Sequence, residues 1–191
     1  MKNKKVVFLD RDGVINRYPG EKKFVTRWEE FHFLPNALKA IRRLTEEGYE
    51  IKVISNQSGI AKGIYSQESL NEITRRMIEE VKREGGRMEV YYCPHREEDG
   101  CDCRKPKIGL FLKATQGKEV DFKSTYFVGD GSIDVEAGKR IGCKTILVGS
   151  GRTKLEDAKK WDIQPDYFAQ DLWEASGIIL KHKNNERQRD N

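Results

Sequence analysis

Two aspartates with one residue between them follow the first apolar run of the chain. Residues 6–9 are all apolar, a length that favours a buried strand, and Asp10 and Asp12 come next. Because successive side chains of a strand point to opposite faces, we expect both carboxylates on one side and Arg11 on the other. Two like charges this close repel each other unless a cation or a shared proton lies between them. Gly13 then lets the backbone turn sharply. Because two close carboxylates need a cation or a shared proton between them, this stretch is predicted to be a functional site.

A second acidic pair follows a later apolar run. Residues 124–128 are predicted to form a strand, with Asp130 and Asp134 after it and Ser132 as a candidate N-cap of the next helix. The alternative role for these acids is capping, which acidic side chains near a helix N-terminus do perform. Capping does not account for the matching pair after the first strand. Carboxylates at two strand ends therefore indicate a hard cation such as Mg²⁺, which is typically shared between carboxylates and a substrate phosphate.

Three thiols and an imidazole lie within eleven residues of one another. They form the pattern Cys93-x-His95 and Cys101-x-Cys103, which is the ligand inventory of a closed tetrahedral zinc site. The alternative is a set of reduced cysteines beside a surface histidine, and four soft ligands in one loop argue against it. Because all four ligands come from the protein, no position is left for water and the zinc is expected to be structural. Cys143 is expected to be a small core residue.

Two cations follow the last of these thiols. Arg104 and Lys105 would be held in place by the zinc loop, which favours an anion-binding role over a solvated surface role. Ser55 and Asn56 stand at the end of another predicted strand, just before Gly59. A hydroxyl and backbone N–H groups at such a strand end can face an anion. This last signal is weak alone, because polar residues follow many strands.

The elements that must position these residues alternate between strands and helices. Strands are predicted over residues 6–9, 49–54, 88–92, 124–128, 144–148 and 166–169, and helices over residues 35–48, 67–84, 108–117, 132–140 and 171–181. This alternation predicts an α/β domain with a parallel central sheet. The candidate residues follow strand ends, where ligands bind in open α/β sheets. Residues 17–33 show no clear period and are predicted to form a long loop over the site.

Length and composition indicate one folded domain. The chain has 191 residues, with a single domain expected over residues 1–181 and a disordered tail over residues 182–191. The net charge of +5 comes with no dense basic stripe, so we expect no nucleic-acid partner, and the positive balance suits a small anionic substrate. No signal peptide or membrane-spanning run is visible, so a cytoplasmic protein with reduced thiols is expected.

Four short motifs support a family resemblance. They are DRDGV at 10–14, SNQ at 55–57, KP at 105–106 and GD followed by Asp134 at 129–134. The chain resembles the haloacid dehalogenase superfamily of phosphatases, which carries such motifs in this order. The longer stretches FLDRDGVIN, SNQSGIAKG, YYCPH and CDCRKP are similar to a narrower group, the D-glycero-D-manno-heptose-1,7-bisphosphate 7-phosphatases, with the histidinol-phosphate phosphatases as kin.

The resemblance implies a fold and a mechanism. The fold would be a Rossmann-like three-layer domain with no inserted cap domain and a small zinc-binding loop at about 93–105. Asp10 would attack phosphorus to give an aspartyl-phosphate. Asp12 would protonate the leaving oxygen and then take a proton from the attacking water. Mg²⁺ would be held by Asp10, Asp130 and the backbone carbonyl of Asp12.

The resemblance also assigns substrate-binding roles. Ser55 and Lys105 would bind the transferring phosphoryl group, with Asn56 beside them. Arg104 would bind the substrate, and its second phosphate is the group that this cation suits. Asp134 would support the site. The expected substrate is a small phosphorylated metabolite, bound by a monomer without a membrane or nucleic acid.

Two departures from the heptose group leave alternatives open. Gly131 stands where the heptose members usually have lysine, and the five residues between His95 and Cys101 resemble the histidinol-phosphate branch. The leading hypothesis is removal of the C7 phosphate of heptose 1,7-bisphosphate. The alternatives are a phosphatase for histidinol phosphate or another sugar phosphate, a nucleic-acid 3′-phosphatase, and a non-catalytic zinc-stabilised binding module.

Overall fold

A single parallel sheet organises the chain. The computed structural model describes residues 5–189, with side chains described through residue 182. The strands are β1 (Val6–Leu9), β2 (Glu50–Asn56), β3 (Glu89–Cys93), β4 (Tyr126–Gly129), β5 (Lys144–Val148) and β6 (Tyr167–Ala169). They form one six-stranded sheet in the order β3-β2-β1-β4-β5-β6, and all neighbouring pairs are parallel. The predicted parallel α/β sheet is confirmed, and its first strand lies at the centre.

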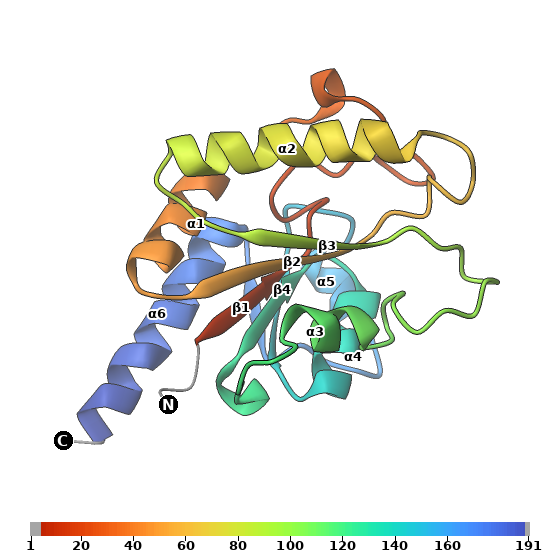
Figure 1. Ribbon diagram of the computed structural model, residues 1–191. Coiled ribbons are helices and arrows are strands. Elements are labelled where there is room, and N and C mark those ends of the chain that lie inside the picture. The colour runs from red at the N-terminus through yellow and green to blue at the C-terminus, as the bar shows by residue number, and fades with distance from the viewer. Residues whose placement is uncertain (1–4, 190–191) are drawn as a thin grey trace.

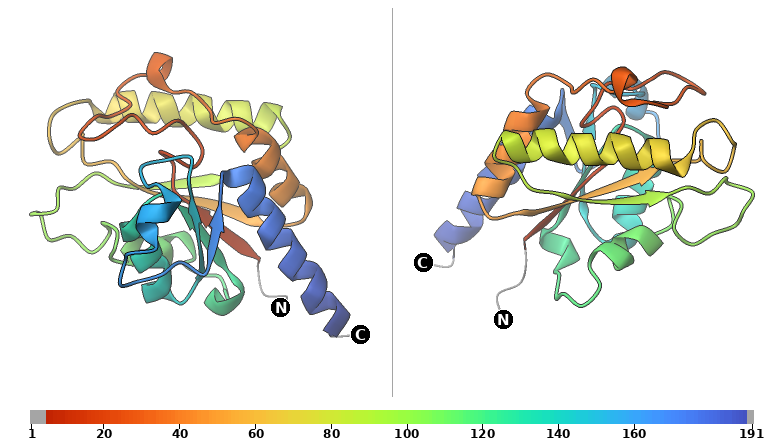
Figure 2. Two further views of the ribbon diagram at one scale, coloured as in Figure 1. Left: turned by 180° about the vertical axis from the view of Figure 1, so that it is seen from behind. Right: turned by 45° about the horizontal axis from the view of Figure 1, so that its top comes forward.

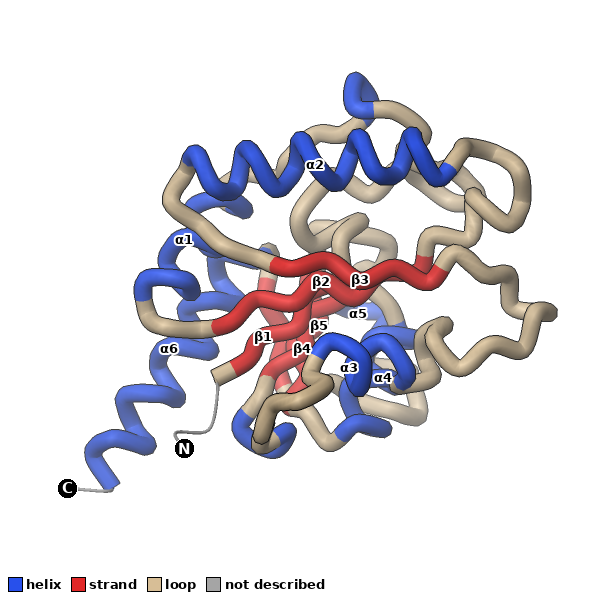
Figure 3. Tube along the Cα trace, in the orientation of Figure 1, coloured by secondary structure: helices blue, strands red, loops and turns tan. Residues whose placement is uncertain are grey.

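Helices cover both faces of this sheet (Figures 1 and 3). The helices are α1 (Ala37–Glu46), α2 (Gln67–Arg83), α3 (Gly109–Ala114), α4 (Ser132–Ile141), α5 (Leu155–Ala158) and α6 (Leu172–Arg189), with short 3₁₀ turns at η1 (Trp28–Glu30) and η2 (Phe122–Ser124). Figure 2 shows α1, α2 and α6 on one face and α3, α4 and α5 on the other. The predicted three-layer architecture is confirmed. Within the described residues, no helix is both long and apolar enough to cross a membrane.

Strand alternation divides the apolar core into two halves. Val7 and Leu9 of β1 pack with α1, α2 and α6, whereas Val6 and Phe8 pack with α3 and α4. On the second face, Phe8 and its neighbours form edge-to-face ring pairs with centroids 4.9 and 5.0 Å apart. Burying a side chain of this kind stabilises the fold by about 1.5–3 kcal/mol. The two packed faces hold β1, and with it the residues that follow β1, in one position.

The helix ends match the sequence in part. Ser66 caps α2 as predicted, because its Oγ accepts a hydrogen bond from the backbone N–H of Ser69 at 3.1 Å. The prediction that Ser132 caps α4 is wrong: Gly131 is the N-cap residue, and the Asp134 carboxylate accepts its backbone N–H at 3.1 Å.

Helix α6 continues past residue 181, where we predicted the domain to end. The expected disorder of residues 182–191 stays a prediction, and residues 190–191 lie outside the described residues.

Candidate active site

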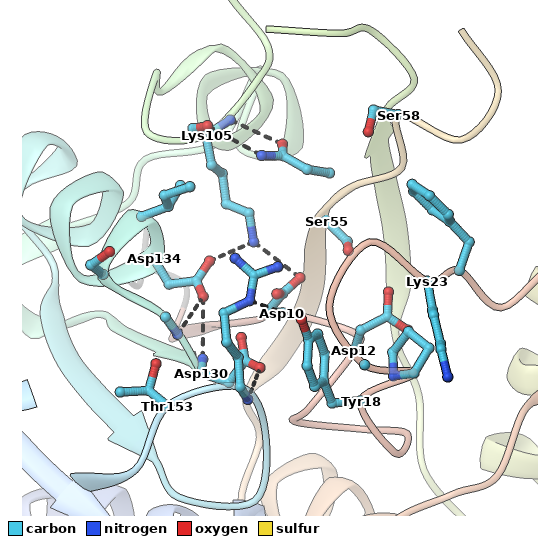
Figure 4. A pocket seen from close by; sticks show the side chains of 18 of the residues that line it. Asp10, Asp12, Tyr18, Lys23, Ser55, Ser58, Lys105, Asp130, Asp134 and Thr153 are labelled. Carbon is cyan, nitrogen blue, oxygen red and sulfur yellow. Dashed lines mark hydrogen bonds and ion pairs between the residues drawn. The ribbon is translucent and has the colours of Figure 1, made fainter. Parts of the chain in front are cut away.

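A cavity of about 680 Å³ opens at the carboxyl ends of β1, β2 and β4 (Figure 4). Its lining includes all eight residues that the sequence places in the phosphate and magnesium site: Asp10, Asp12, Ser55, Asn56, Arg104, Lys105, Asp130 and Asp134. These residues span more than 120 positions of the chain. They meet because the strands that carry them are parallel and end at one edge of the sheet.

A buried lysine joins the two ends of the acidic cluster. Lys105 Nζ lies 3.0 Å from Asp10 Oδ1 and 2.6 Å from Asp134 Oδ1 (Figure 4). Asp10 Oδ1 also accepts the backbone N–H of Arg11 at 2.8 Å. The backbone of Asp10 donates to the carbonyl of Val128 at 2.9 Å, which holds the end of β1 against β4. Asp10 is thus fixed through one carboxylate oxygen.

The acidic cluster is poised to bind a cation. Carboxylate oxygens of Asp10, Asp130 and Asp134 lie within 4.8 Å of one another, and all three residues are buried. Burial, together with the neighbouring carboxylates, raises the pKa of Asp10 to about 6, although Lys105 opposes the shift. Burial, Asp134 and Asp10 raise the pKa of Asp130 to about 8. A bound divalent cation would remove this cost, and carboxylate oxygens are the donors that Mg²⁺ prefers.

Two glycines make room for the Asp130 carboxylate. A Cβ on Gly13 or on Gly151 would overlap the side chain of Asp130. Gly13 also has φ +82°, a conformation that favours glycine. The side-chain hydroxyl of Ser150 donates to the carbonyl of Gly13 at 2.7 Å, so the loop after β5 packs directly on the first motif. Gly13 belongs to the site predicted from the sequence, whereas Gly151 and this loop do not.

The Asp12 carboxylate is held by three donors. Arg11 Nη2 lies 3.0 Å from both of its oxygens, Asn16 Nδ2 donates to Oδ1 at 2.9 Å, and Gln57 Nε2 donates to Oδ2 at 3.0 Å. The hydroxyl of Tyr65 donates to Gln57 Oε1 at 2.6 Å and so orients that amide. Asp12 therefore has one fixed orientation at the cavity wall.

The position of Arg11 agrees with its prediction in part. Arg11 does not line the cavity, as strand alternation predicts, but its guanidinium pairs with the Asp12 carboxylate. The guanidinium carbon lies 6.0 Å from the ring centre of Phe31 and 5.7 Å from that of Tyr92. The side chain of Arg11 is fully buried. The sequence shows an arginine between two aspartates, and this arrangement does not reveal which of the two acids it pairs with.

The end of β2 contributes Ser55 and Asn56 in different ways. Ser55 is buried, and its hydroxyl accepts a hydrogen bond from Gln57 Nε2 at 3.2 Å. Both polar atoms of the Asn56 amide bind the backbone of Lys105, with Nδ2 donating to its carbonyl at 3.1 Å and Oδ1 accepting its N–H at 3.0 Å. Asn56 thus lines the cavity while its amide holds Lys105 in place.

The four predicted zinc ligands meet in one cluster after β3. The sulfur atoms of Cys93, Cys101 and Cys103 are 3.1–3.6 Å apart, and Nδ1 of His95 lies 3.2 Å from the Cys103 sulfur and 3.7 Å from that of Cys93. These separations are close to the roughly 3.5–3.8 Å edges of a tetrahedron with Zn–S bonds near 2.3 Å. They are much too long for a disulfide. The donor set and its spacing therefore fit a structural zinc ion.

The zinc loop also holds Arg104. Its Nη1 donates to the carbonyl of His95 at 3.3 Å, and its side chain lines the cavity. The next residue, Lys105, is the buried cation of the acidic cluster. The loop thus positions two successive cations, as predicted from their place after the last thiol.

Comparison with known proteins gives a consistent result. The profile of the HAD-hydrolase-like family matches residues 102–175. The chain is 39% identical over 194 residues to the D-glycero-D-manno-heptose-1,7-bisphosphate 7-phosphatase of Chlorobaculum tepidum, covering 94% of this chain and 96% of the relative. It is 38% identical over 151 residues to the D-glycero-beta-D-manno-heptose-1,7-bisphosphate 7-phosphatase of Pseudomonas aeruginosa, covering 78% and 84%. The chain belongs to the heptose-bisphosphate phosphatase family.

A solved structure of this family has the same fold. The D,D-heptose 1,7-bisphosphate phosphatase from B. bronchiseptica, complexed with magnesium and phosphate, gives a TM-score of 0.84 at 32% identity and covers 93% of this chain and 99% of that chain. The predicted superfamily, phosphatase activity and fold are confirmed.

Gly131 stands where we expect a lysine in the heptose-bisphosphate phosphatases. A Cβ there would meet only Asp134 Oδ2, at 3.7 Å, so neither space nor a positive φ requires glycine.

Proposed function

We propose that the chain removes the C7 phosphate of D-glycero-D-manno-heptose 1,7-bisphosphate through an aspartyl-phosphate. The observation that carries the proposal is the convergence of eight predicted residues in one cavity. Relatives that share 38–39% of their residues with this chain are named for that activity. A cavity of about 680 Å³ suits a small sugar phosphate.

Asp10 is the proposed nucleophile. Both of its polar contacts use Oδ1, which accepts from the Arg11 backbone and pairs with Lys105. Oδ2 is therefore the oxygen available to attack phosphorus. Lys105 Nζ and the Ser55 hydroxyl would bind non-bridging oxygens of the phosphoryl group and stabilise the charge that it carries in the transition state. The phosphorus–oxygen bond to the sugar breaks as the bond to Asp10 forms.

Asp12 is the proposed acid and base. A sugar alkoxide is a poor leaving group, so a proton from the Asp12 carboxyl group would pass to the departing oxygen. The resulting carboxylate would then take a proton from the water that attacks the aspartyl-phosphate. Its bonds to Asn16 and Gln57 fix the direction in which the free lone pairs point.

Asp10, Asp130 and the backbone carbonyl of Asp12 would hold Mg²⁺, which supplies charge neutralisation between the carboxylates and the phosphate. Asp134 is better suited to a supporting role. Its Oδ1 pairs with Lys105, and its Oδ2 accepts backbone N–H groups of Asp130 and Gly131 at 3.2 and 3.1 Å. Asp134 thus holds the Asp130 backbone and Lys105 together.

Magnesium should stabilise the protein more at pH 8.5 than at pH 5.5. Without metal, the raised pKa values of Asp10 and Asp130 (about 6 and about 8) keep these groups protonated in the folded state while the unfolded chain ionises near pH 4. Their contribution to the free energy of unfolding therefore falls as the pH rises from about 4 to about 8. Mg²⁺ binds the ionised carboxylates and removes this loss. Melting temperatures with and without Mg²⁺ at both pH values test it, with Asp130→Asn as the variant that should lose the effect; equal Mg²⁺ shifts at both pH values would contradict it.

Arg104 is the proposed partner of the second phosphate. The bond from its guanidinium to the His95 carbonyl uses only Nη1, so other donors remain for an anion.

We also propose a monomer that stays in the cytoplasm and binds no nucleic acid. One chain supplies the whole cavity, and the separate thiols of the zinc cluster suit a reducing compartment.

Removing one zinc ligand should lower stability and metal content together. For Cys101→Ser we expect a fall in melting temperature of roughly 3–10 °C, because a weaker zinc site contributes less folding free energy. Cys143→Ala is the matched control, since this thiol is buried but is not one of the four clustered ligands. Metal analysis should find one zinc per chain in the wild type and in the control. A wild-type protein purified without chelator and lacking zinc would refute the zinc assignment.

A substrate panel tests the proposed function. Phosphate release should be fastest from heptose 1,7-bisphosphate, assayed as both anomers, and much slower from histidinol phosphate, other sugar phosphates and a 3′-phosphorylated oligonucleotide. Release only from C7, seen by ³¹P NMR of the product, would support the regiochemistry. A strong preference for histidinol phosphate would overturn the heptose assignment and leave the phosphatase mechanism in place.

A further inference from the structure

The acidic site has few fixed positive charges on the Asp130 side. Four of the five carboxylates in the cavity lining belong to this site: Asp10, Asp12, Asp130 and Asp134. Among residues 5–182, ion pairs to them come from Arg11 on Asp12 and from Lys105 on Asp10 and Asp134. Asp130 has no such partner in that range, and the next residue has no side chain. A phosphate dianion that enters here adds negative charge at the least neutralised part of the site.

The loop after β5 brings Arg152 to this place. The backbone N–H of Arg152 donates to Asp130 Oδ2 at 2.7 Å. Two neighbouring contacts fix the same backbone: the Ser150 hydroxyl bonds to the Gly13 carbonyl, and Gly151 packs so closely on Asp130 that a Cβ would overlap it. The backbone from 150 to 152 is therefore held against the acidic cluster. The side chain that it carries lines the cavity.

The guanidinium of Arg152 is oriented but not saturated. Its Nε donates to the hydroxyl of Tyr18 at 3.2 Å, and its central carbon lies 5.4 Å from the centre of the Tyr18 ring. Figure 4 shows Tyr18 beside the cavity near Asp12 and Asp10. Within the part of the chain with described side chains, Nη1 and Nη2 have no hydrogen-bond acceptor. Two parallel N–H donors of a guanidinium match two oxygens of a phosphate.

Other cations line the cavity, but none has this placement. Lys22, Lys23, Lys62 and Lys154 are all part of the lining, and Lys62 lies 5.6 Å from the ring centre of Phe24. None of these lysines is bonded to Asp130 or to its backbone neighbours in the described residues.

We propose that Arg152 is a further binding residue for the phosphoryl group, donating from Nη1 and Nη2 to its non-bridging oxygens on the Asp130 side, with Tyr18 as the positioning residue. The proposal rests on the proposed phosphatase function and extends it. It also gives a consequence for position 131. Because a side chain fits there, a lysine at 131 can restore a positive charge beside Asp130 when Arg152 is absent.

Binding of inorganic phosphate in the presence of Mg²⁺ tests the proposal by calorimetry, without turnover. Loss of two charge-assisted hydrogen bonds in Arg152→Gln should weaken phosphate binding roughly ten- to hundredfold. Tyr18→Phe keeps the charge and should weaken it by less than about threefold. Lys154→Gln is the matched control, because it removes a cation from the same loop and cavity, and it should bind phosphate like the wild type. The double variant Gly131→Lys with Arg152→Gln should recover most of the lost affinity.

The outcomes distinguish the role of Arg152 from the proposed phosphatase function. If the wild type binds no phosphate with Mg²⁺, the proposed function fails. If the wild type binds and Arg152→Gln binds equally well, the role of Arg152 is refuted while the function stands. An equal loss in Lys154→Gln would also refute it, since general electrostatics would then explain the effect. A defect with heptose bisphosphate but not with inorganic phosphate would place Arg152 at the second phosphate and overturn the assignment.

Discussion

Replacing Asp10 with asparagine should reduce phosphate release by more than about 10⁴-fold. The amide oxygen of asparagine cannot form a stable covalent bond to phosphorus, so the aspartyl-phosphate does not form. The fold should survive, because an amide Oδ1 can still accept from the Arg11 backbone and from Lys105. The variant also removes one of the clustered negative charges that raise the pKa of Asp130.

Two measurements accompany this variant. Acid-quenched enzyme incubated with ³²P-labelled substrate should carry label in the wild type and none in Asp10→Asn. Asp162→Asn is the control, because Asp162 is exposed and is not among the residues that line the cavity. Its turnover and melting temperature should equal those of the wild type. Turnover of Asp10→Asn close to the wild-type rate would exclude Asp10 as the nucleophile.

Much of the site could be predicted because its residues follow strand ends. A parallel sheet gathers all its carboxyl ends at one edge, so Asp10, Ser55 and Asp130 had to be neighbours once the strands were recognised. The zinc cluster was predictable for a different reason, since its four ligands lie in one short loop. Neither inference needed any knowledge of long-range packing.

The residues that the sequence did not reveal act through contacts between distant loops. Arg152 reaches Tyr18 across 134 positions, and the loop after β5 carries no recognisable motif. Gln57 belongs to the SNQ motif at the end of a predicted strand, but its bond to Asp12 depends on how β1 and β2 pair. Asp134 and Ser132 compete for the start of α4, and only the structure shows that the carboxylate caps it. Such choices depend on tertiary packing, which local propensity does not contain.

Replacing Asp12 with asparagine should lower turnover of heptose bisphosphate by roughly 10²- to 10⁴-fold, which is the usual value of general acid–base catalysis. The side-chain amide can keep a bond from Asn16 or Gln57, so the pocket should stay intact. The nucleophile remains, and so the variant should still form the aspartyl-phosphate when the leaving group needs no proton. With an aryl phosphate such as p-nitrophenyl phosphate, the first step should be nearly unaffected.

This difference between leaving groups identifies the role of Asp12. In rapid-quench experiments, Asp12→Asn should release a burst of p-nitrophenol and then accumulate labelled enzyme, because the water that cleaves the aspartyl-phosphate lacks its base. Gln57→Leu is the matched control: it removes one donor to Asp12 but keeps the carboxylate, so it should show no accumulation and lose less than about tenfold in rate. An equal defect with both substrates and no labelled enzyme would mean that Asp12 acts before bond formation. Its contacts would then serve to hold the backbone carbonyl that we assign to Mg²⁺, and proton transfer would need another group.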